Sequence, residues 1–143
     1  MEESLDFQYF KKIFQVEHAD ATSYSPLALA YIGDAIFDVM VRTIEVSKVN
    51  KQVNKYHKDV SKIVCATAQA KMIQAIHEQL TPEEQYIYKR GRNANSYTKA
   101  KNASRAEYRM ATGFEALLGY LYLNENFKRL TDVVHMALEA AEE

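Results

Sequence analysis

The sequence contains few of the residues that interrupt helices or cross-link a chain. Its 143 residues include four glycines, two prolines, one cysteine and no tryptophan. So few turn-forming residues argue against a β architecture, which needs many turns, and leave few places where a helix can break. The single cysteine, Cys65, cannot form an internal disulfide, and its apolar neighbours predict that it is a small core residue. The composition therefore predicts an all-α fold.

A long apolar run and a targeting signal are also lacking. The longest uncharged stretch, residues 21–33, has 13 residues, whereas a membrane-spanning helix needs roughly 18 or more apolar residues. The N-terminal residues are acidic and do not resemble a signal peptide. With 48% hydrophobic residues, the chain is long enough for one core and short for two. We therefore expect residues 1–143 to form a single domain that is located in the cytoplasm and does not enter the membrane.

Apolar spacing and capping signals predict six or seven helices. Ser25 can cap a helix whose first residue is Pro26, and Asn50 is the expected cap of a later helix. Thr81 and Ser104 each precede a glutamate by three residues, which is the spacing of a capping box. The expected helices cover residues 5–16, 26–46, 51–79 (bent or split near 59–61), 82–91, 105–123 and 127 to the C-terminus.

Two acidic residues stand in otherwise apolar helices. Asp34 interrupts the apolar stretch 27–39, whose apolar positions surround most of the helix and predict burial on several sides. Glu115 is the only charged residue in the stretch 111–123. Three of the four glycines lie close to these two acids in the sequence. A buried carboxylate needs a cation, hydrogen-bond donors or a changed protonation state, so both positions require an explanation.

Two explanations fit these acids from spacing alone. Asp34 and Glu115 could share a hard divalent ion such as Mg²⁺, which prefers oxygen ligands. Alternatively, they could be structural and pair with Arg42, Arg109 or helix N-termini, while the glycines let helices pack closely. Asp38, one helical turn after Asp34, could join a metal site, but a partly exposed position suits it better.

Positive charge is concentrated in one segment, although the formal net charge of the whole chain is -1. Residues 89–109 contain seven Lys or Arg and a single acid, Glu107, so the local balance is 7 minus 1, or +6. Within this segment, residues 93–102 lack apolar periodicity and predict a polar loop suited to phosphate and sugar contacts. A solvated surface is the alternative. The residues expected to contact a polyanion of this kind are Lys89, Arg90, Arg92, Asn93, Lys99, Lys101 and Arg105.

Two motifs resemble the catalytic domain of ribonuclease III. The stretch LAYIGDAIFD contains Gly33 and Asp34 and is similar to the family's Leu-Gly-Asp-Ala signature helix. The stretch GFEALLGYLYL contains Glu115 and is similar to its later Phe-Glu-Ala-Leu-Ile-Gly helix. The order and separation of the motifs also match. The stretch KRGRNA at 89–94 and the expected lack of a double-stranded-RNA-binding domain resemble the bacterial Mini-III subfamily.

This resemblance implies an all-α homodimer whose signature helices pack across the two-fold axis. It implies a metal-dependent endoribonuclease that uses Mg²⁺, with Mn²⁺ as a substitute, and leaves 5′-phosphate and 3′-hydroxyl ends on double-stranded RNA. By motif position, Asp34 and Glu115 are the catalytic residues and metal ligands. The subfamily further implies a substrate in the precursor of large-subunit ribosomal RNA, and a ribosomal protein as a candidate partner.

The match to the larger enzymes is incomplete. Leu27 and Ala30 stand where those enzymes carry acids before the signature aspartate, and Thr112 stands where they carry an aspartate before the final glutamate. Mini-III enzymes are similarly reduced, so activity is still predicted, with Thr112 expected to hydrogen-bond a water of the metal site. The missing acids leave two alternatives open: a catalytically inactive dimer that binds duplex RNA, and a helical interaction domain with structural acids.

Overall fold

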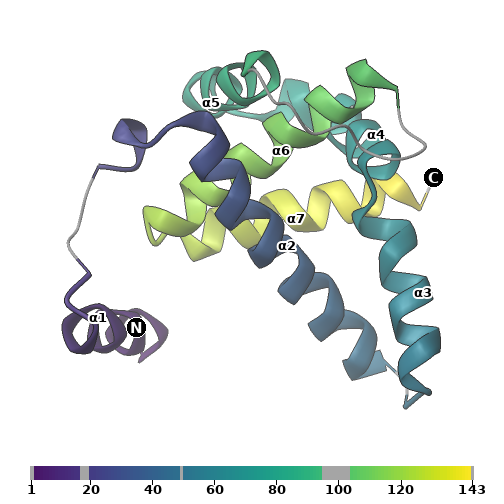
Figure 1. The fold of residues 1–143 in the computed structure, drawn as a ribbon, viewed down its shortest axis with the longest axis horizontal. Coiled ribbons are helices and arrows are strands. Elements are labelled where there is room, and N and C mark those ends of the chain that lie inside the picture. The colour runs from purple at the N-terminus through teal and green to yellow at the C-terminus, as the bar shows by residue number, and fades with distance from the viewer. Residues whose placement is uncertain (1, 17–19, 49, 95–103, 143) are drawn as a thin grey trace.

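The computed structural model describes residues 2–16, 20–48, 50–94 and 104–142, with side chains from residue 7 onward. These residues form helices and no strand, which confirms the all-α prediction (Figure 1). No helix in this part of the chain is long and apolar enough to cross a membrane. The helices are α1 (Glu2–Ile13), α2 (Pro26–Lys48), α3 (Val53–Val64), α4 (Ala66–Ile76), α5 (Pro82–Asn93), α6 (Arg105–Leu123) and α7 (Phe127–Ala141). The 3-10 turn Ala21–Ser23 precedes α2, and a second one, His77–Gln79, follows α4.

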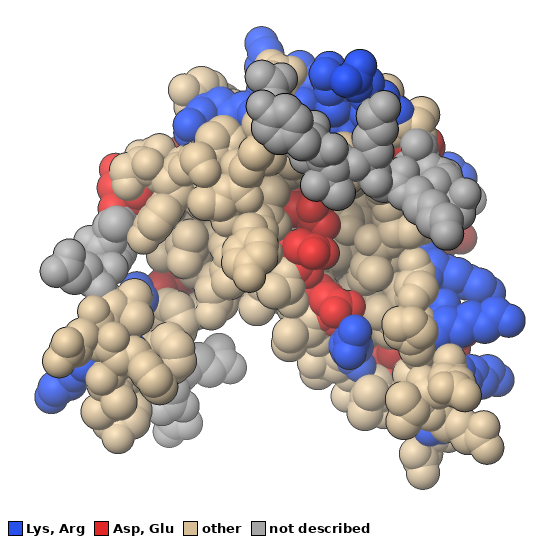
Figure 2. All heavy atoms as spheres, viewed as in Figure 1, with Lys and Arg blue, Asp and Glu red and all other residues tan. Residues whose placement is uncertain are grey.

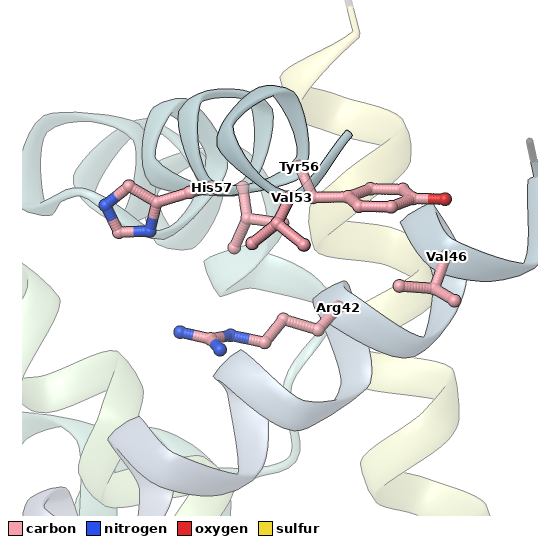
Figure 3. A pocket seen from close by; sticks show the side chains of 6 residues that line it. Arg42, Val46, Val53, Tyr56 and His57 are labelled. Carbon is pink, nitrogen blue, oxygen red and sulfur yellow. The ribbon is translucent and has the colours of Figure 1, made fainter. Parts of the chain in front are cut away.

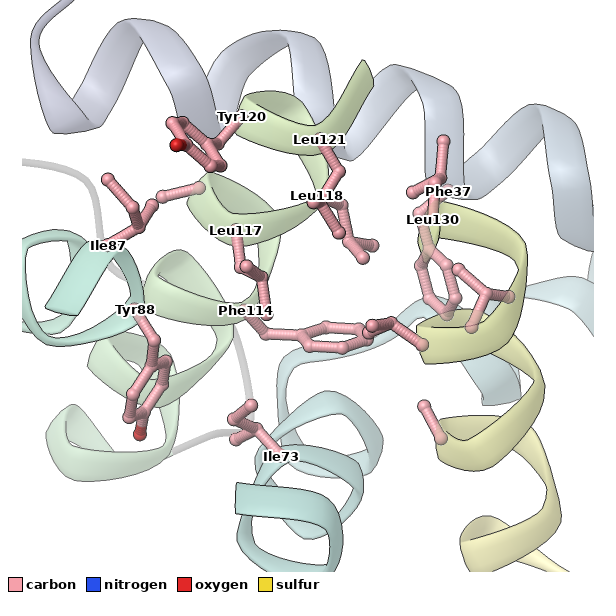
Figure 4. Close-up of a cluster of buried hydrophobic side chains, with 14 of the residues drawn as sticks. Phe37, Ile73, Ile87, Tyr88, Phe114, Leu117, Leu118, Tyr120, Leu121 and Leu130 are labelled. Atoms are coloured by element: carbon pink, nitrogen blue, oxygen red, sulfur yellow. The ribbon is translucent and has the colours of Figure 1, made fainter. Parts of the chain in front are cut away.

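Helix α6 is the centre of the fold. Ten of its 19 residues are buried, and it packs against α2, α4, α5 and α7. In the core, the ring of Phe37 from α2 meets the ring of Phe114 from α6 edge to face, with 5.5 Å between their centroids (Figure 4). Both side chains are fully buried. Because α6 is covered on most sides, a charged residue on it has little access to water, which is the condition that makes Glu115 unusual.

Two glycines allow α2 and α6 to touch backbone to backbone. A Cβ atom at Gly33 would lie 1.8 Å from the carbonyl oxygen of Glu115, and one at Gly119 would lie 2.0 Å from the carbonyl oxygen of Leu29. No larger side chain fits at either position without moving the helices apart. The glycines therefore do let the helices pack closely, as one of the two explanations proposed. The same contact places Asp34, which follows Gly33, beside Glu115.

The predicted helix starts are largely confirmed. The hydroxyl of Ser25 accepts a hydrogen bond of 3.1 Å from the backbone N–H of Ala28. Thr81 and Ser104 both form complete capping boxes. The glutamate of the first box, Glu84, also accepts two hydrogen bonds of 2.8 Å from Arg129 and so ties the start of α5 to α7. Local capping rules are reliable here because each cap is satisfied within four residues.

The first helix has the predicted length but begins and ends three residues earlier, at Glu2–Ile13. It ends at Ile13 rather than at residue 16, because Gln15 adopts a left-handed backbone with φ of 54°, which a continuing α-helix does not tolerate. The next helices also depart from the prediction. Helix α3 begins at Val53, after Gln52 and not after Asn50.

The expected break near residues 59–61 is instead at Cys65. This residue has an extended backbone, with φ of -71° and ψ of 159°, and separates α3 from α4. The side chain of Gln69 donates to the carbonyl oxygen of Val64 at 2.8 Å and so satisfies the end of α3. Cys65 is exposed, which corrects the prediction of a core cysteine: its apolar neighbours face the core, but the residue at the break points outward.

We predict that Gly33→Ala and Gly119→Ala each lower the free energy of unfolding by at least about 2 kcal/mol, because the added methyl overlaps the facing backbone. The control is Thr43→Ala, at an exposed position of α2. All three substitutions raise helix propensity, so only the close crossing separates them. Denaturant unfolding measures the difference. Glycine variants as stable as the control would contradict the close contact.

Candidate active site

Asp34 and Glu115 lie next to each other where α2 crosses α6. The Asp34 carboxyl is within hydrogen-bonding reach of the Glu115 carboxyl, so the structure brings together the two acids that the sequence analysis singled out. Glu115 is half-buried, whereas Asp34 is exposed in the single chain. The prediction that Asp34 is buried on several sides is therefore wrong for one chain.

The exposure of Asp34 follows from the two apolar faces of α2. One face packs on α6, and the other carries apolar side chains that are open to solvent, including Leu27, Tyr31 and Val39, with exposed fractions of 39%, 83% and 57%. Periodicity detects that a residue is surrounded by apolar positions. It does not separate a face that packs on the same chain from one that remains available to a partner.

Glu115 carries a proton at neutral pH when no cation is near it. Burial, the adjacent negative charge of Asp34 and a hydrogen bond with Asp34 together raise the pKa of Glu115 to about 8. A hydrogen bond of 3.2 Å from the Gln69 amide opposes this shift. In the described part of the chain neither acid forms an ion pair with Lys or Arg, and Arg42 pairs with Asp38 at 3.1 Å. The alternative in which Arg42 neutralises Asp34 is therefore wrong.

The residues of this site fit a hard divalent cation. When both acids are ionised, their carboxylates repel each other where α2 crosses α6. Mg²⁺ prefers such oxygen ligands. A cation there would replace the proton on Glu115 and relieve the repulsion. Among the described residues no three His, Cys, Asp or Glu side chains gather into a metal-binding group, so this part of the chain offers two carboxylates, and water or substrate oxygen atoms would occupy other positions around a cation. This agrees with the missing acids at Leu27 and Ala30.

Two uncharged residues lie near Glu115: Thr112, one helical turn earlier on α6, and Gln69 on α4. Thr112 is buried, and its hydroxyl donates to the carbonyl oxygen of Tyr108 at 3.0 Å, so it can only accept further hydrogen bonds. Gln69 contacts Glu115 directly, and the sequence analysis did not select it. Its position in the helical repeat could have identified it. Gln69 shares the buried face of α4 with Ile73 and Ile76, and glutamine is unusual on such an apolar face.

Three of the predicted RNA-contacting residues, Lys89, Arg90 and Asn93, lie near Pro26 at the start of α2. Lys89, Asn93 and Arg105 are exposed. Arg90 and Arg92 are half-buried, and Arg90 lies 5.9 Å from the ring centre of Tyr86. Figure 2 shows Lys and Arg along the edge of the face where α5 lies and Asp and Glu down its middle. Lys99 and Lys101 lie outside the described residues.

A hollow of about 410 Å³ lies within this basic region. Its lining combines the cations of α5 with the N-terminus of α2, where backbone N–H groups favour anions. Tyr86, which the sequence analysis did not select, also lines the hollow, and 59% of its surface is exposed. The residues that line the hollow are Pro26, Tyr86, Lys89, Arg90 and Asn93.

A second cavity, of about 350 Å³, lies between α2 and α3 (Figure 3). Arg42 and His57 supply its polar groups, and three valines and a tyrosine supply the remainder of its wall. Neither Asp34 nor Glu115 lines it. It contains no carboxylate and no pair of acidic groups, so the acid pair and not this cavity is the candidate for catalysis.

The comparison with protein families agrees with the fold and the acid pair. The model of the ribonuclease III domain matches residues 27–126, which include both acids. The chain therefore belongs to the ribonuclease III family. Within that family it is similar to Mini-ribonuclease 3 of Clostridium tetani, with 47% identity over 87% of this chain and 83% of the relative.

Further relatives point the same way. Mini-ribonuclease 3 of Streptococcus pneumoniae is 44% identical over 86% of this chain and 98% of its own length. Among solved structures, a Fusobacterium nucleatum protein matches with a TM-score of 0.75 and 27% identity over 84% of this chain and 96% of that one. These matches confirm the resemblance drawn from the two motifs.

We predict that Glu115→Gln stabilises the cation-free protein increasingly as the pH rises from 4.5 to 8. In this window the unfolded chain has lost the proton of Glu115, whose ordinary pKa is 4.5, while the folded chain keeps it up to about pH 8. The folded wild type therefore loses stability as the pH rises, and glutamine removes this loss. Melting temperatures in chelator across the window test this, with exposed Glu142→Gln as control. A pH-independent difference between wild type and Glu115→Gln would contradict the raised pKa.

Proposed function

We propose that this protein is an endoribonuclease that hydrolyses double-stranded RNA, with Asp34 and Glu115 as its metal ligands. The observation that carries the proposal is the acid pair at the α2–α6 crossing, in a chain of the ribonuclease III family. The raised pKa of Glu115 marks a carboxylate that has no cationic partner among the described residues. Such a group is poorly explained by a structural role and well explained by a cation site.

The two carboxylates supply the negative charge that holds a divalent ion against the RNA. When bound, Mg²⁺ or Mn²⁺ orients the scissile phosphate and lowers the pKa of an attacking water. Glu115 must release its proton for this to happen. The water loses one proton as its oxygen forms the new bond to phosphorus, the bond from phosphorus to O3′ breaks, and O3′ takes up one proton, so the protons balance. The products carry 5′-phosphate and 3′-hydroxyl ends, as the family resemblance implies, and Thr112 is suited to accept a hydrogen bond from a water of the site.

The basic region supports binding of the duplex backbone. Its hollow begins at Pro26, eight residues before Asp34, or about 12 Å along the axis of α2. Lysine and arginine side chains and a helix N-terminus all bind phosphate, and none of them reads base sequence. We propose that this surface supplies affinity and that the shape of A-form RNA supplies selectivity.

The exposed apolar face of α2 supports a homodimer. Leu27, Tyr31 and Val39 are open to solvent on the helix that carries Asp34, and large apolar side chains that are exposed together on one helix are typical of an interface. A second copy packed there would cover the surroundings of Asp34 and bring two acid pairs to one duplex, one for each strand. Together with the Mini-III resemblance, this favours structured precursors of large-subunit ribosomal RNA as substrate, in the cytoplasm, with a ribosomal protein as a candidate partner.

One observation favours a second function. The site offers two carboxylates where a fully ligated pair of metal ions needs more, so a duplex-binding dimer without catalysis is the alternative. The cleavage experiment separates the two functions, because the alternative binds RNA and leaves it intact.

We predict that Asp34→Asn and Glu115→Gln each slow cleavage of duplex RNA in Mg²⁺ by about a thousandfold, because metal catalysis contributes several kcal/mol to lowering the barrier. Asp132→Asn, on α7 and paired with Lys128, is the matched control and keeps wild-type activity. Single-turnover cleavage of labelled duplex RNA measures the rates. Equal cleavage by all four proteins would contradict the assignment, and binding without cleavage by the wild type would favour the alternative.

We predict that Lys89→Gln and Arg92→Gln weaken duplex binding and reduce its dependence on salt. Each lost phosphate contact lowers the slope of log affinity against log salt by about one. Lys128→Gln, exposed on α7, is the control. Binding titrations at several salt concentrations measure the slopes. An unchanged slope in the first two variants would identify the basic segment as a solvated surface.

We predict that the protein sediments as a dimer and that Tyr31→Glu shifts it toward the monomer, because a charge replaces an apolar ring with 83% of its surface exposed. Thr43→Glu, at another exposed position of α2, tests whether any added charge on this helix has the same effect. A monomeric wild type at micromolar concentration would contradict the two-strand arrangement.

A further inference from the structure

Gln69 is a buried polar residue beside the acid pair. It lies on α4 with 1% of its surface exposed. Its amide nitrogen donates to the carbonyl oxygen of Val64 at 2.8 Å and to Oε2 of Glu115 at 3.2 Å. Both amide hydrogens are used in these two bonds, so the amide group is held between the end of α3 and the acidic site on α6.

The other end of this amide is unsatisfied. Oε1 of Gln69 is fully buried and has no hydrogen-bond partner among the described residues. A buried acceptor without a partner costs about 1–3 kcal/mol, and methionine has a similar shape without that acceptor. Glutamine is therefore not the residue that packing alone favours here. What it provides and an apolar residue lacks is the N–H that reaches Glu115.

We propose that Gln69 is a positioning residue that fixes Oε2 of Glu115 and so leaves the second carboxylate oxygen for the cation shared with Asp34. The inference rests on the proposed function. A glutamate side chain has several rotamers and loses entropy when it is fixed. A site with two carboxylates binds a cation weakly if one of them rotates away. In many metalloproteins, hydrogen bonds to the metal ligands hold those ligands in the binding orientation.

The first test is cation affinity, measured as free Mn²⁺ by electron paramagnetic resonance. We expect Gln69→Met to bind Mn²⁺ about ten- to a hundredfold more weakly than the wild type, the usual effect of losing a hydrogen bond to a metal ligand. Gln74→Met, at an exposed position of α4, makes the same chemical change away from the site and should bind as the wild type does. Equal affinity in both variants overturns the proposal.

The second test separates positioning from a structural role. If Gln69 positions Glu115, the Mg²⁺ concentration for half-maximal cleavage rises by the same factor as the Mn²⁺ dissociation constant, while kcat at saturating Mg²⁺ stays close to the wild-type value. If Gln69 only joins α3 to α4 through Val64, the melting temperature and kcat fall together and the Mg²⁺ dependence is unchanged. The second result overturns the proposal.

The wild type provides a test that does not depend on a folded variant. The side-chain ¹⁵N–¹H signals of Gln69 should move during a Mg²⁺ titration, because the carboxylate that accepts its hydrogen bond of 3.2 Å then also binds a cation. Signals that stay in place while the cation binds overturn the proposal. A wild type that binds no cation and cleaves no duplex removes the proposed function itself, whereas one that binds and cleaves with an unchanged Gln69→Met variant removes only the role of Gln69.

Discussion

The direct contact between the backbones of α2 and α6 is the constraint on which the site depends. With no side chain at Gly33 or Gly119, the two helices approach closely enough for backbone atoms to meet. The crossing brings the residues next to these glycines within reach of each other, so Asp34 and Glu115 meet without any loop to position them. Sites on regular helices are held more rigidly than sites on loops. The packing of the core and the geometry of the acid pair are therefore one structural feature.

This close crossing places the partly buried Glu115 beside a second carboxylate, and the described residues supply no cation to neutralise the pair. Glu115 lies on the most buried helix of the fold and faces a second carboxylate, and burial and that charge both favour its protonated form. Elsewhere the fold neutralises its buried acid: Glu84 receives two hydrogen bonds from Arg129 at 2.8 Å. No such partner is given to Glu115 by the described residues, and its Gln69 contact is neutral. This contrast is consistent with a structural role for Glu84 and with the catalytic role proposed for Glu115.

Much of this could be predicted from the sequence, and the failures have physical causes. The capping boxes at Thr81 and Ser104 depend on residues three positions apart, so local patterns suffice. The pairing of Asp34 with Glu115 could be proposed because both are misfits in apolar helices. The exposure of Asp34 could not be predicted, because an apolar helix face that is exposed in one chain has the same periodicity as one that faces the core. Gln69 was missed because its importance comes from a contact with a residue 46 positions away, which spacing does not encode.

A site with so few acids makes cation binding and RNA binding interdependent. Two carboxylates leave most of the coordination positions of Mg²⁺ to water or to oxygen atoms of the substrate. A phosphate that replaces one of those waters strengthens the hold on the cation, and by thermodynamic linkage the cation strengthens the hold on the phosphate by the same factor. The basic hollow at Pro26 and Lys89 then has a second role beyond affinity: by holding the duplex backbone near the acid pair, it raises the local concentration of the missing ligand. In the proposed mechanism, part of the metal site is therefore supplied by the RNA.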